Sequence, residues 1–228
     1  MSETAAAPAL HPDVAAQIDA LALTRGRPLI ISDADEVLFA FMAGFERFLH
    51  TIDLYFHWGS YALAGNVRRK SDDTPLEAEA VRGLLPRFFA EHTEMLEPVP
   101  GAAEALRALS ARAQIVVLSN LPLEQIAARR RALAKHGMDY PLIANIGGKG
   151  TAVRHLEALV EAPVFFIDDI PNQHSSVRKA ADKVLCLHLI ADPRLAKLLG
   201  PAEHSDHRAE DWAAARAYME AALDRLGY

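Results

Sequence analysis

Apolar residues follow two alternating patterns along this chain. Short continuous runs rich in valine, isoleucine and leucine are typical of strands buried on both faces of a sheet. Such runs lie at residues 28–33, 114–120, 141–145, 163–169 and 183–189. Segments with apolar residues three and four positions apart lie between most of them, which predicts helices. The alternation predicts an α/β fold: a three-layer, Rossmann-like core with a parallel sheet covered by helices on both faces.

The predicted helices cover residues 11–24, 102–111, 123–136, 151–160, 175–181 and 208–226. Residues 1–10 carry no such pattern, and we expect them to be disordered. Before the last helix, the segment His204-Ser205-Asp206-His207 has metal-binding residue types. We interpret it as a polar loop in which Ser205 or Asp206 caps the helix. The run Arg129-Arg130-Arg131 is interpreted as a solvent-exposed helix face.

The segment between the first and second predicted strands has a different character. Aromatic residues are concentrated in it, and Phe41, Phe45 and Phe48 have helical spacing with no strand-like run after them. Its end is marked by Glu97-Pro98-Val99-Pro100-Gly101, a strong turn signal. We therefore expect a small helical cap of residues 41–97, inserted into a discontinuous core of residues 1–40 and 98–228.

Polar side chains follow the predicted strands at their carboxyl ends or in adjacent loops. Ligands bind beyond the carboxyl ends of strands in open α/β sheets, so these groups are expected to converge. Clustered carboxylates repel one another unless a hard cation such as Mg²⁺ neutralises them. A hydroxyl, backbone N–H groups and an ammonium suit phosphoryl oxygens. The residues are Asp33 and Asp35, Ser119 and Asn120, Lys149, and Asp168 and Asp169.

This ordered set resembles the haloacid dehalogenase superfamily. The first motif of that family is an apolar strand followed by Asp-x-Asp, here Asp33-Ala34-Asp35-Glu36-Val37-Leu38. A strand ending in Ser119, a lysine opening a helix (Lys149) and a strand ending in Asp168-Asp169 match the other three motifs. The segment 98–101 is similar to the family's return from cap to core, and the resemblance extends over residues 28 to about 190.

The resemblance implies a catalytic role for each matched residue. Asp33 would be the nucleophile that forms an aspartyl-phosphate. Asp35 would protonate the leaving alcohol and then activate water. Ser119 and the backbone of Asn120 would bind phosphoryl oxygens, and Lys149 would pair with charge on both nucleophile and phosphate.

The resemblance also implies a Mg²⁺ site and shows where this chain departs from the family. The carboxylate of Asp33, the backbone carbonyl of Asp35 and either Asp168 or Asp169 would hold the ion. Gln173 stands where many relatives carry a further acid, and Glu36 where several sugar-phosphate enzymes have glycine. Because of these two differences, the resemblance does not assign the chain to a subfamily.

Asp35 favours phosphoryl transfer over dehalogenation, because a halide leaving group needs no proton. The sequence thus predicts a magnesium-dependent phosphatase acting on a small phosphorylated metabolite. A phosphomutase or other phosphotransferase of the family, and a non-catalytic binding module, are the alternatives. Within the cap, Trp58, Arg68 and Arg69 are candidates for substrate contacts.

Composition restricts the partners and the compartment. The net charge of −6 argues against nucleic acid or an anionic membrane as the main partner. No apolar run approaches the length needed to span a bilayer, and the N-terminus lacks the features of a secretory signal. The single cysteine, Cys186, lies in an apolar run and is expected to fill the core, which suits a reducing cytoplasm. The oligomeric state stays open.

Overall fold

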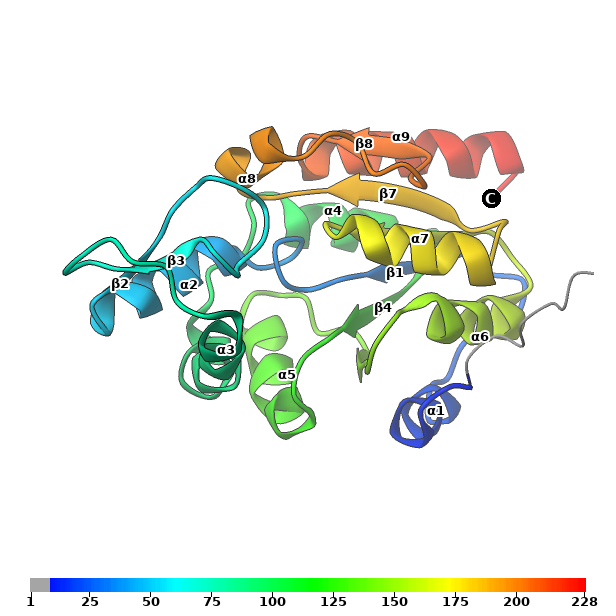
Figure 1. Cartoon of the computed structure of the whole chain (residues 1–228). Helices are drawn as coiled ribbons and strands as arrows, with labels where there is room; N and C mark the ends of the chain where they lie inside the picture. Colours follow the sequence, from blue (N-terminus) through cyan, green and yellow to red (C-terminus); the bar gives the residue numbers. More distant parts are fainter. Residues whose placement is uncertain (1–8) are drawn as a thin grey trace, which may run out of the picture.

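The core of the protein is a parallel sheet with helices on both faces, as predicted. A computed structural model describes residues 9–228, so the disorder expected for residues 1–10 falls almost wholly outside the described range. Within these residues six strands form one sheet in the order β5-β4-β1-β6-β7-β8 (Figure 1). The strands are β1 (Leu29–Ser32), β4 (Gln114–Ser119), β5 (Leu142–Ala144), β6 (Val164–Asp168), β7 (Leu185–Leu189) and β8 (His207–Ala209).

Alternate residues of the central strand β1 point to opposite faces of the sheet, and each face is covered by helices. Leu29 and Ile31 belong to a buried cluster with α1 (Pro12–Asp19), α6 (Gly150–Val160) and α7 (Pro171–Ala180). Ile30 belongs to a second cluster on the other face. That cluster includes α4 (Ala102–Leu109), α5 (Ile126–Lys135) with the short helix η2 (Leu123–Gln125) before it, and α9 (Trp212–Leu226).

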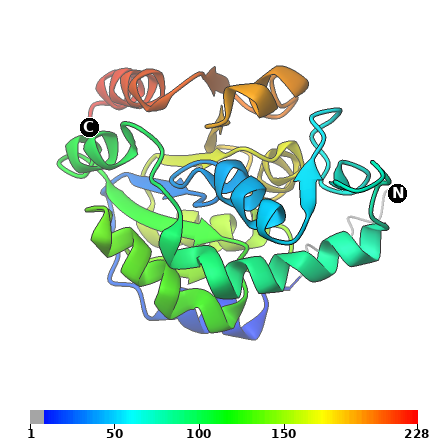
Figure 2. The same ribbon diagram turned by 90° about the vertical axis from the view of Figure 1, so that its left-hand side faces the viewer.

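The segment between β1 and α4 lies beyond the carboxyl ends of the strands. It contains α2 (Phe41–Thr51), β2 (Leu54–Phe56), β3 (Val67–Arg69), α3 (Ala78–His92) and the short helix η1 (Thr93–Met95). Figure 2 faces this end of the molecule and shows α2 and α3 across it. The chain leaves and re-enters the core at adjacent points, because the Ala40 N–H donates to Glu97 and the Val99 N–H donates to Leu38.

The prediction of a helical cap over residues 41–97 is wrong in one respect. β2 and β3 pair as a two-stranded antiparallel sheet in which Leu54 faces Arg69 and Phe56 faces Val67. Each strand has three residues, which is too short for an alternating pattern to stand out from the surrounding aromatic residues. The helical part packs around a group of aromatic rings in tilted and edge-to-face contact that includes Phe45, Phe48 and Phe88.

The structure also corrects the prediction for the C-terminal region. The segment before the last helix contains the edge strand β8, and α9 begins at Trp212 with Asp211 as its N-cap. Asp206 accepts a hydrogen bond from the Cys186 N–H (2.7 Å) and pairs with Arg178 (2.7 Å), so it does not cap the helix. A three-residue edge strand with polar residues has no apolar run by which to recognise it.

Two buried residues, Trp212 and Cys186, lie in the core of the fold. Trp212 is fully buried, and its indole N–H donates to the Val37 carbonyl at 2.8 Å, so α9 reaches the loop after β1. Cys186 is buried in the core as expected. Between residues 9 and 228, no helix is long and apolar enough to cross a membrane.

Candidate active site

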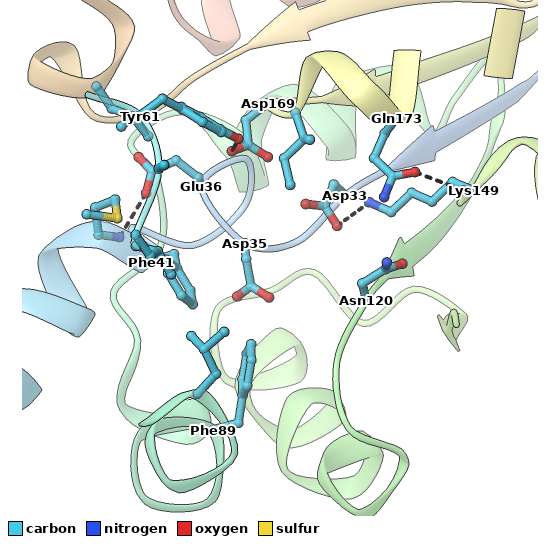
Figure 3. A pocket seen from close by; sticks show the side chains of 16 residues that line it. Asp33, Asp35, Glu36, Phe41, Tyr61, Phe89, Asn120, Lys149, Asp169 and Gln173 are labelled. Carbon is cyan, nitrogen blue, oxygen red and sulfur yellow. Dashed lines mark hydrogen bonds and ion pairs between the residues drawn. The ribbon is translucent and has the colours of Figure 1, made fainter. Parts of the chain in front are cut away.

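The charged residues predicted for the site meet at the carboxyl end of the sheet. Asp33 directly follows β1, Asp168 ends β6, and Lys149 immediately precedes α6. The Lys149 ammonium lies 2.6 Å from Asp33 Oδ1 and 2.6 Å from Asp168 Oδ2, and all three side chains are buried. Asp33, Asp35, Asn120, Lys149 and Asp169 line a cavity of about 290 Å³ (Figure 3).

This end of the cavity carries an excess of negative charge. The pKa of Asp33 is raised to about 7, mainly by burial and also by the nearby carboxylates of Asp168 and Asp35, against the opposing effect of Lys149. Burial and the same cluster raise the pKa of Asp169 well above its usual value. Burial alone would lower the pKa of Lys149, but Asp168 and Asp33 raise it above the ordinary lysine value. A single ammonium is thus shared between two buried carboxylates, and the pKa values of Asp33 and Asp169 stay raised beside it.

The same carboxylates fit a divalent cation. Ligand atoms of Asp33, Asp168 and Asp169 all lie within 4.8 Å of one another. Both oxygens of Asp168 are engaged, one by Lys149 and one by the Ile170 N–H (2.9 Å). In contrast, Asp169 Oδ1 is buried and has no hydrogen-bond partner among the described residues. A hard cation such as Mg²⁺ would satisfy this oxygen and neutralise the excess charge, so the residues present fit the group.

Comparison with solved structures assigns the fold. No family model matches the chain, and no curated protein matches it. A haloacid dehalogenase-like protein of unknown function from Agrobacterium tumefaciens is 15% identical over 87% of this chain and 100% of that chain, with a TM-score of 0.59. A hydrolase of the haloacid dehalogenase family from Deinococcus radiodurans, with bound phosphate and sodium, is 17% identical over 87% and 96%, with a TM-score of 0.56. A candidate β-phosphoglucomutase from Bacteroides vulgatus is 12% identical over 95% and 97%, with a TM-score of 0.53.

This chain has the haloacid dehalogenase-like fold. Identities of 12–17% describe the shared architecture, and the chemistry must be argued from the residues of this chain.

In this haloacid dehalogenase-like core, the second aspartate of the first motif is held by a residue that the sequence analysis placed on the surface. Arg129, on α5, is completely buried, and its Nη2 donates to Asp35 Oδ1 at 2.6 Å. Its guanidinium carbon lies 4.9 Å from the centre of the Phe39 ring. The exposed face predicted for Arg129–Arg131 is therefore wrong at Arg129 and correct at Arg130 and Arg131. Helical periodicity was an available signal, because Arg129 shares its face with the buried Ala132 and Leu133.

The second motif of the fold contributes differently from what the resemblance implies. Ser119 is fully buried and its hydroxyl lies 3.5 Å from Asp35 Oδ2, so it contacts the second aspartate and does not line the cavity. Asn120 does line the cavity, and its side-chain amide donates to the Gly147 carbonyl at 2.8 Å. This hydrogen bond connects the end of β4 with the loop that carries Lys149.

The two positions that depart from the family pattern have structural roles. Glu36 has a left-handed backbone (φ +63°), and its buried carboxylate accepts from the N–H groups of Met42 (2.9 Å) and Asp192 (2.6 Å). Burial raises the pKa of Glu36 to about 7. Gln173 Oε1 accepts from the Lys149 N–H at 2.8 Å and so positions the loop of the lysine. Through its two hydrogen bonds, Glu36 connects the start of α2 with the segment before α8 (Pro193–Leu198).

None of the three cap residues proposed for substrate contact lines the cavity. The Trp58 indole donates to Glu46 at 3.0 Å and lies 3.9 Å from the Arg194 guanidinium carbon. Arg68 pairs with Asp73, and Arg69 donates to Thr74. The inserted segment instead contributes mainly apolar residues to the lining: Phe41, Met42, Tyr61, Ala62, Leu63, Leu85 and Phe89. The positions of Leu85 and Phe89, one helical turn apart on α3, were the available signal.

Proposed function

We propose that this protein is a magnesium-dependent phosphatase that hydrolyses a small phosphorylated metabolite through an aspartyl-phosphate on Asp33. The observation that supports it best is the cluster of Asp33, Lys149 and Asp168 beside the unpartnered oxygen of Asp169. The bound phosphate in the Deinococcus radiodurans structure of the same fold is consistent with this proposal.

The charged end of the cavity would bind and orient the phosphoryl group. Asp33, Asp169 and the backbone carbonyl of Asp35 would hold Mg²⁺, which when bound neutralises the carboxylates and the phosphate charge. Lys149 holds one oxygen of Asp33 and so restricts rotation of the attacking carboxylate. The ammonium also offsets charge that builds on the phosphoryl oxygens during transfer to Asp33. Backbone N–H groups near Asn120 would bind the remaining oxygens.

Asp35 would move the proton. Figure 3 shows its carboxyl between the Asp33–Lys149 pair and the rings of Phe41 and Phe89, where the leaving oxygen of a bound ester would lie. It would protonate that oxygen as the ester bond breaks and later accept a proton from the attacking water. The inserted segment 41–97 would cover the cavity and exclude bulk water during both steps.

Replacement of the nucleophile tests the proposal directly. In Asp33→Asn, magnesium-dependent hydrolysis of 4-nitrophenyl phosphate should fall by roughly 10⁴-fold or more. Asp19→Asn, at an exposed position at the end of α1, is the matched control and should retain activity. Borohydride reduction of acid-quenched enzyme should convert Asp33 to homoserine, detected by mass spectrometry. Full magnesium-dependent activity in Asp33→Asn would show that the mechanism is wrong.

A phosphomutase is the second candidate, since the fold is shared with a candidate β-phosphoglucomutase. The two activities differ in the fate of the phosphoryl group: a phosphatase releases inorganic phosphate, whereas a mutase returns an isomerised substrate. Phosphorus NMR of the reaction with a sugar phosphate distinguishes them, and isomerisation without phosphate release would favour the mutase.

A further inference from the structure

The end of the cavity away from Lys149 is apolar. Residues from α2, α3, the loop before β3 and α8 form it: Phe41, Met42, Leu63, Leu85, Phe89 and Leu195. The rings of Phe41 and Phe89 have centroids 6.0 Å apart, so they form one continuous wall. In Figure 3 these rings lie on the opposite side of Asp35 from Asp33 and Lys149. A leaving group attached to a phosphate at Lys149 would therefore contact this wall.

The polar groups next to the apolar wall are already bonded within the protein. Both carboxylate oxygens of Glu36 accept from backbone N–H groups, and both oxygens of Asp35 are contacted by core side chains. The Tyr61 hydroxyl donates to Asp169 at 3.2 Å. Among residues 9–228, Lys149 is the one cationic side chain in the lining, and it is paired with two carboxylates. Apart from the proton that Asp35 would pass to the ester oxygen, little hydrogen-bonding capacity is left for a ligand at this end.

This arrangement discriminates among phosphate esters by their leaving groups. A sugar would bury several hydroxyl groups without partners, and an unpaired buried polar group is strongly unfavourable. A second anionic group would meet the carboxylates of Glu36 and Asp35 with no free cation to offset it. An apolar group would gain from removal of its surface from water. The cavity volume of about 290 Å³ lies just below the usual range for ligand pockets, which favours a small leaving group.

We infer that the substrate is the phosphate monoester of a small, uncharged, apolar alcohol or phenol; this inference rests on the phosphatase function proposed above. A carboxylate oxygen of Asp33 forms a bond to phosphorus as the ester P–O bond breaks with its electron pair on the alcohol oxygen, which takes the proton of Asp35. Water then displaces Asp33 from phosphorus and returns a proton to Asp35. Ester and water thus give apolar alcohol and inorganic phosphate, with no further reactant.

Two matched pairs of esters test the inference on the full-length, magnesium-loaded protein. Cyclohexylmethyl phosphate has the six-membered ring and primary ester of glucose 6-phosphate without the hydroxyl groups. Its kcat/KM should exceed that of glucose 6-phosphate by roughly 100-fold or more. Benzyl phosphate should likewise be preferred over 4-carboxybenzyl phosphate, which adds one negative charge.

Two adjacent residues of α3 provide a matched pair of variants. Leu84 and Leu85 are both half-buried, but Leu85 alone of the two lines the cavity. Leu85→Ser should reduce the preference for cyclohexylmethyl phosphate over glucose 6-phosphate by roughly tenfold, because it removes apolar contact and adds a hydroxyl. Leu84→Ser should leave the preference unchanged. Leu85→Lys should raise kcat/KM for 4-carboxybenzyl phosphate relative to benzyl phosphate.

Binding to Asp33→Asn, which blocks turnover, supplies a readout independent of activity. Calorimetric titration should show tighter binding of cyclohexylmethyl phosphate than of glucose 6-phosphate, with a negative heat-capacity change from apolar burial. Asp33-dependent hydrolysis with equal or better use of glucose 6-phosphate would overturn the inference and leave the phosphatase function intact. Hydrolysis of none of the four esters would overturn the proposed function and the inference together.

Discussion

The two ends of the cavity are built from different parts of the chain and by different physical rules. At the phosphate end, charged groups from the ends of β1 and β6 and the start of α6 are buried in contact with one another. At the cap end, apolar side chains from α2, α3 and neighbouring loops form a wall with little free polar capacity. A change at the first end should affect all substrates alike, whereas a change at the second should affect the choice among them.

The largest effect is expected from Lys149→Met, which tests the phosphate end. Removal of the ammonium leaves the buried carboxylates of Asp33 and Asp168 without their shared partner. The free energy of unfolding, measured with urea in the presence of a chelator, should fall by about 3–5 kcal/mol. Activity should fall by roughly 10³-fold or more on every ester, with no change in their order of preference. Lys183→Met, at an exposed position, is the control. A loss of activity confined to one class of ester would show that the phosphate end does not act on all substrates alike.

The next largest effect is expected at the border between the two ends, from Arg129→Met. This change removes the guanidinium that holds Asp35 Oδ1, so the carboxyl that moves the proton loses its orientation. We expect kcat to fall by roughly 10²-fold while KM changes little. Arg129→Lys should restore part of the rate, and Arg130→Met, one position along at an exposed site, should behave as wild type. A kcat within twofold of wild type in Arg129→Met would contradict the positioning role.

The free energy of unfolding is expected to depend on pH through His188, which bonds the backbone of Asp169 at the phosphate end. His188 donates from Nε2 to the Asp169 carbonyl (2.9 Å) and accepts at Nδ1 from the Ala202 N–H (3.1 Å), which requires the neutral ring. Burial lowers the pKa of His188 to about 4, against an ordinary value of 6.5. Between these values the unfolded chain binds more protons, so His188 contributes stability above pH 6.5 that is lost as the pH falls towards 4.

Urea unfolding at two pH values checks this contribution. The stability advantage of wild type over His188→Gln should shrink by about 2 kcal/mol between pH 7 and pH 5. Comparison with the variant removes the opposing contribution of Asp33 and Asp169, whose pKa values are raised in the folded protein. An advantage that stays constant over this range would show that His188 is not held neutral.

The smallest effect is expected from Glu36→Gln, which weakens the connection between the two ends. The carboxylate accepts from the N–H groups of both Met42 and Asp192, whereas an amide has a single acceptor oxygen. The free energy of unfolding should fall by about 1–2 kcal/mol at pH 8, where the carboxylate is ionised. Glu203→Gln, at an exposed position, is the control. Equal losses in the two variants would leave Glu36 no special role in joining α2 to the core.

The phosphate end could be predicted from sequence because it depends on strand ends. Buried parallel strands are recognisable as apolar runs, and the residues that follow Ser32 and Ile167 must lie at one edge of the sheet. Arg129 was missed because a guanidinium is counted as polar in any pattern, although it is held here by Asp35 and Phe39. Helical periodicity placed Arg129 on the face of the buried Ala132 and Leu133, but its partner Asp35 is distant in the sequence and no local pattern identifies it.

The cap end could be located but not described in advance. The concentration of aromatic residues marked the insertion, yet β2 and β3 are too short to be recognised by alternation. Which side chains face the cavity depends on how α2 and α3 pack over the sheet, so Arg68 and Arg69 were expected to contact the substrate and Leu85 was not considered. β8 also has only three residues, and it became evident only from its pairing with β7.

The hydrogen bond from Trp212 to Val37 has a consequence for folding. It joins residues 175 positions apart, and it ties the last helix to the loop that carries both motif aspartates. Contacts of such sequence separation form late because a long loop must close first. During synthesis the strands of the central sheet emerge before α9, so the loop acquires this anchor only when the final helix docks. We therefore expect the active site to be among the last parts of the molecule to mature, and a nascent chain that lacks α9 to be inactive even with its sheet assembled.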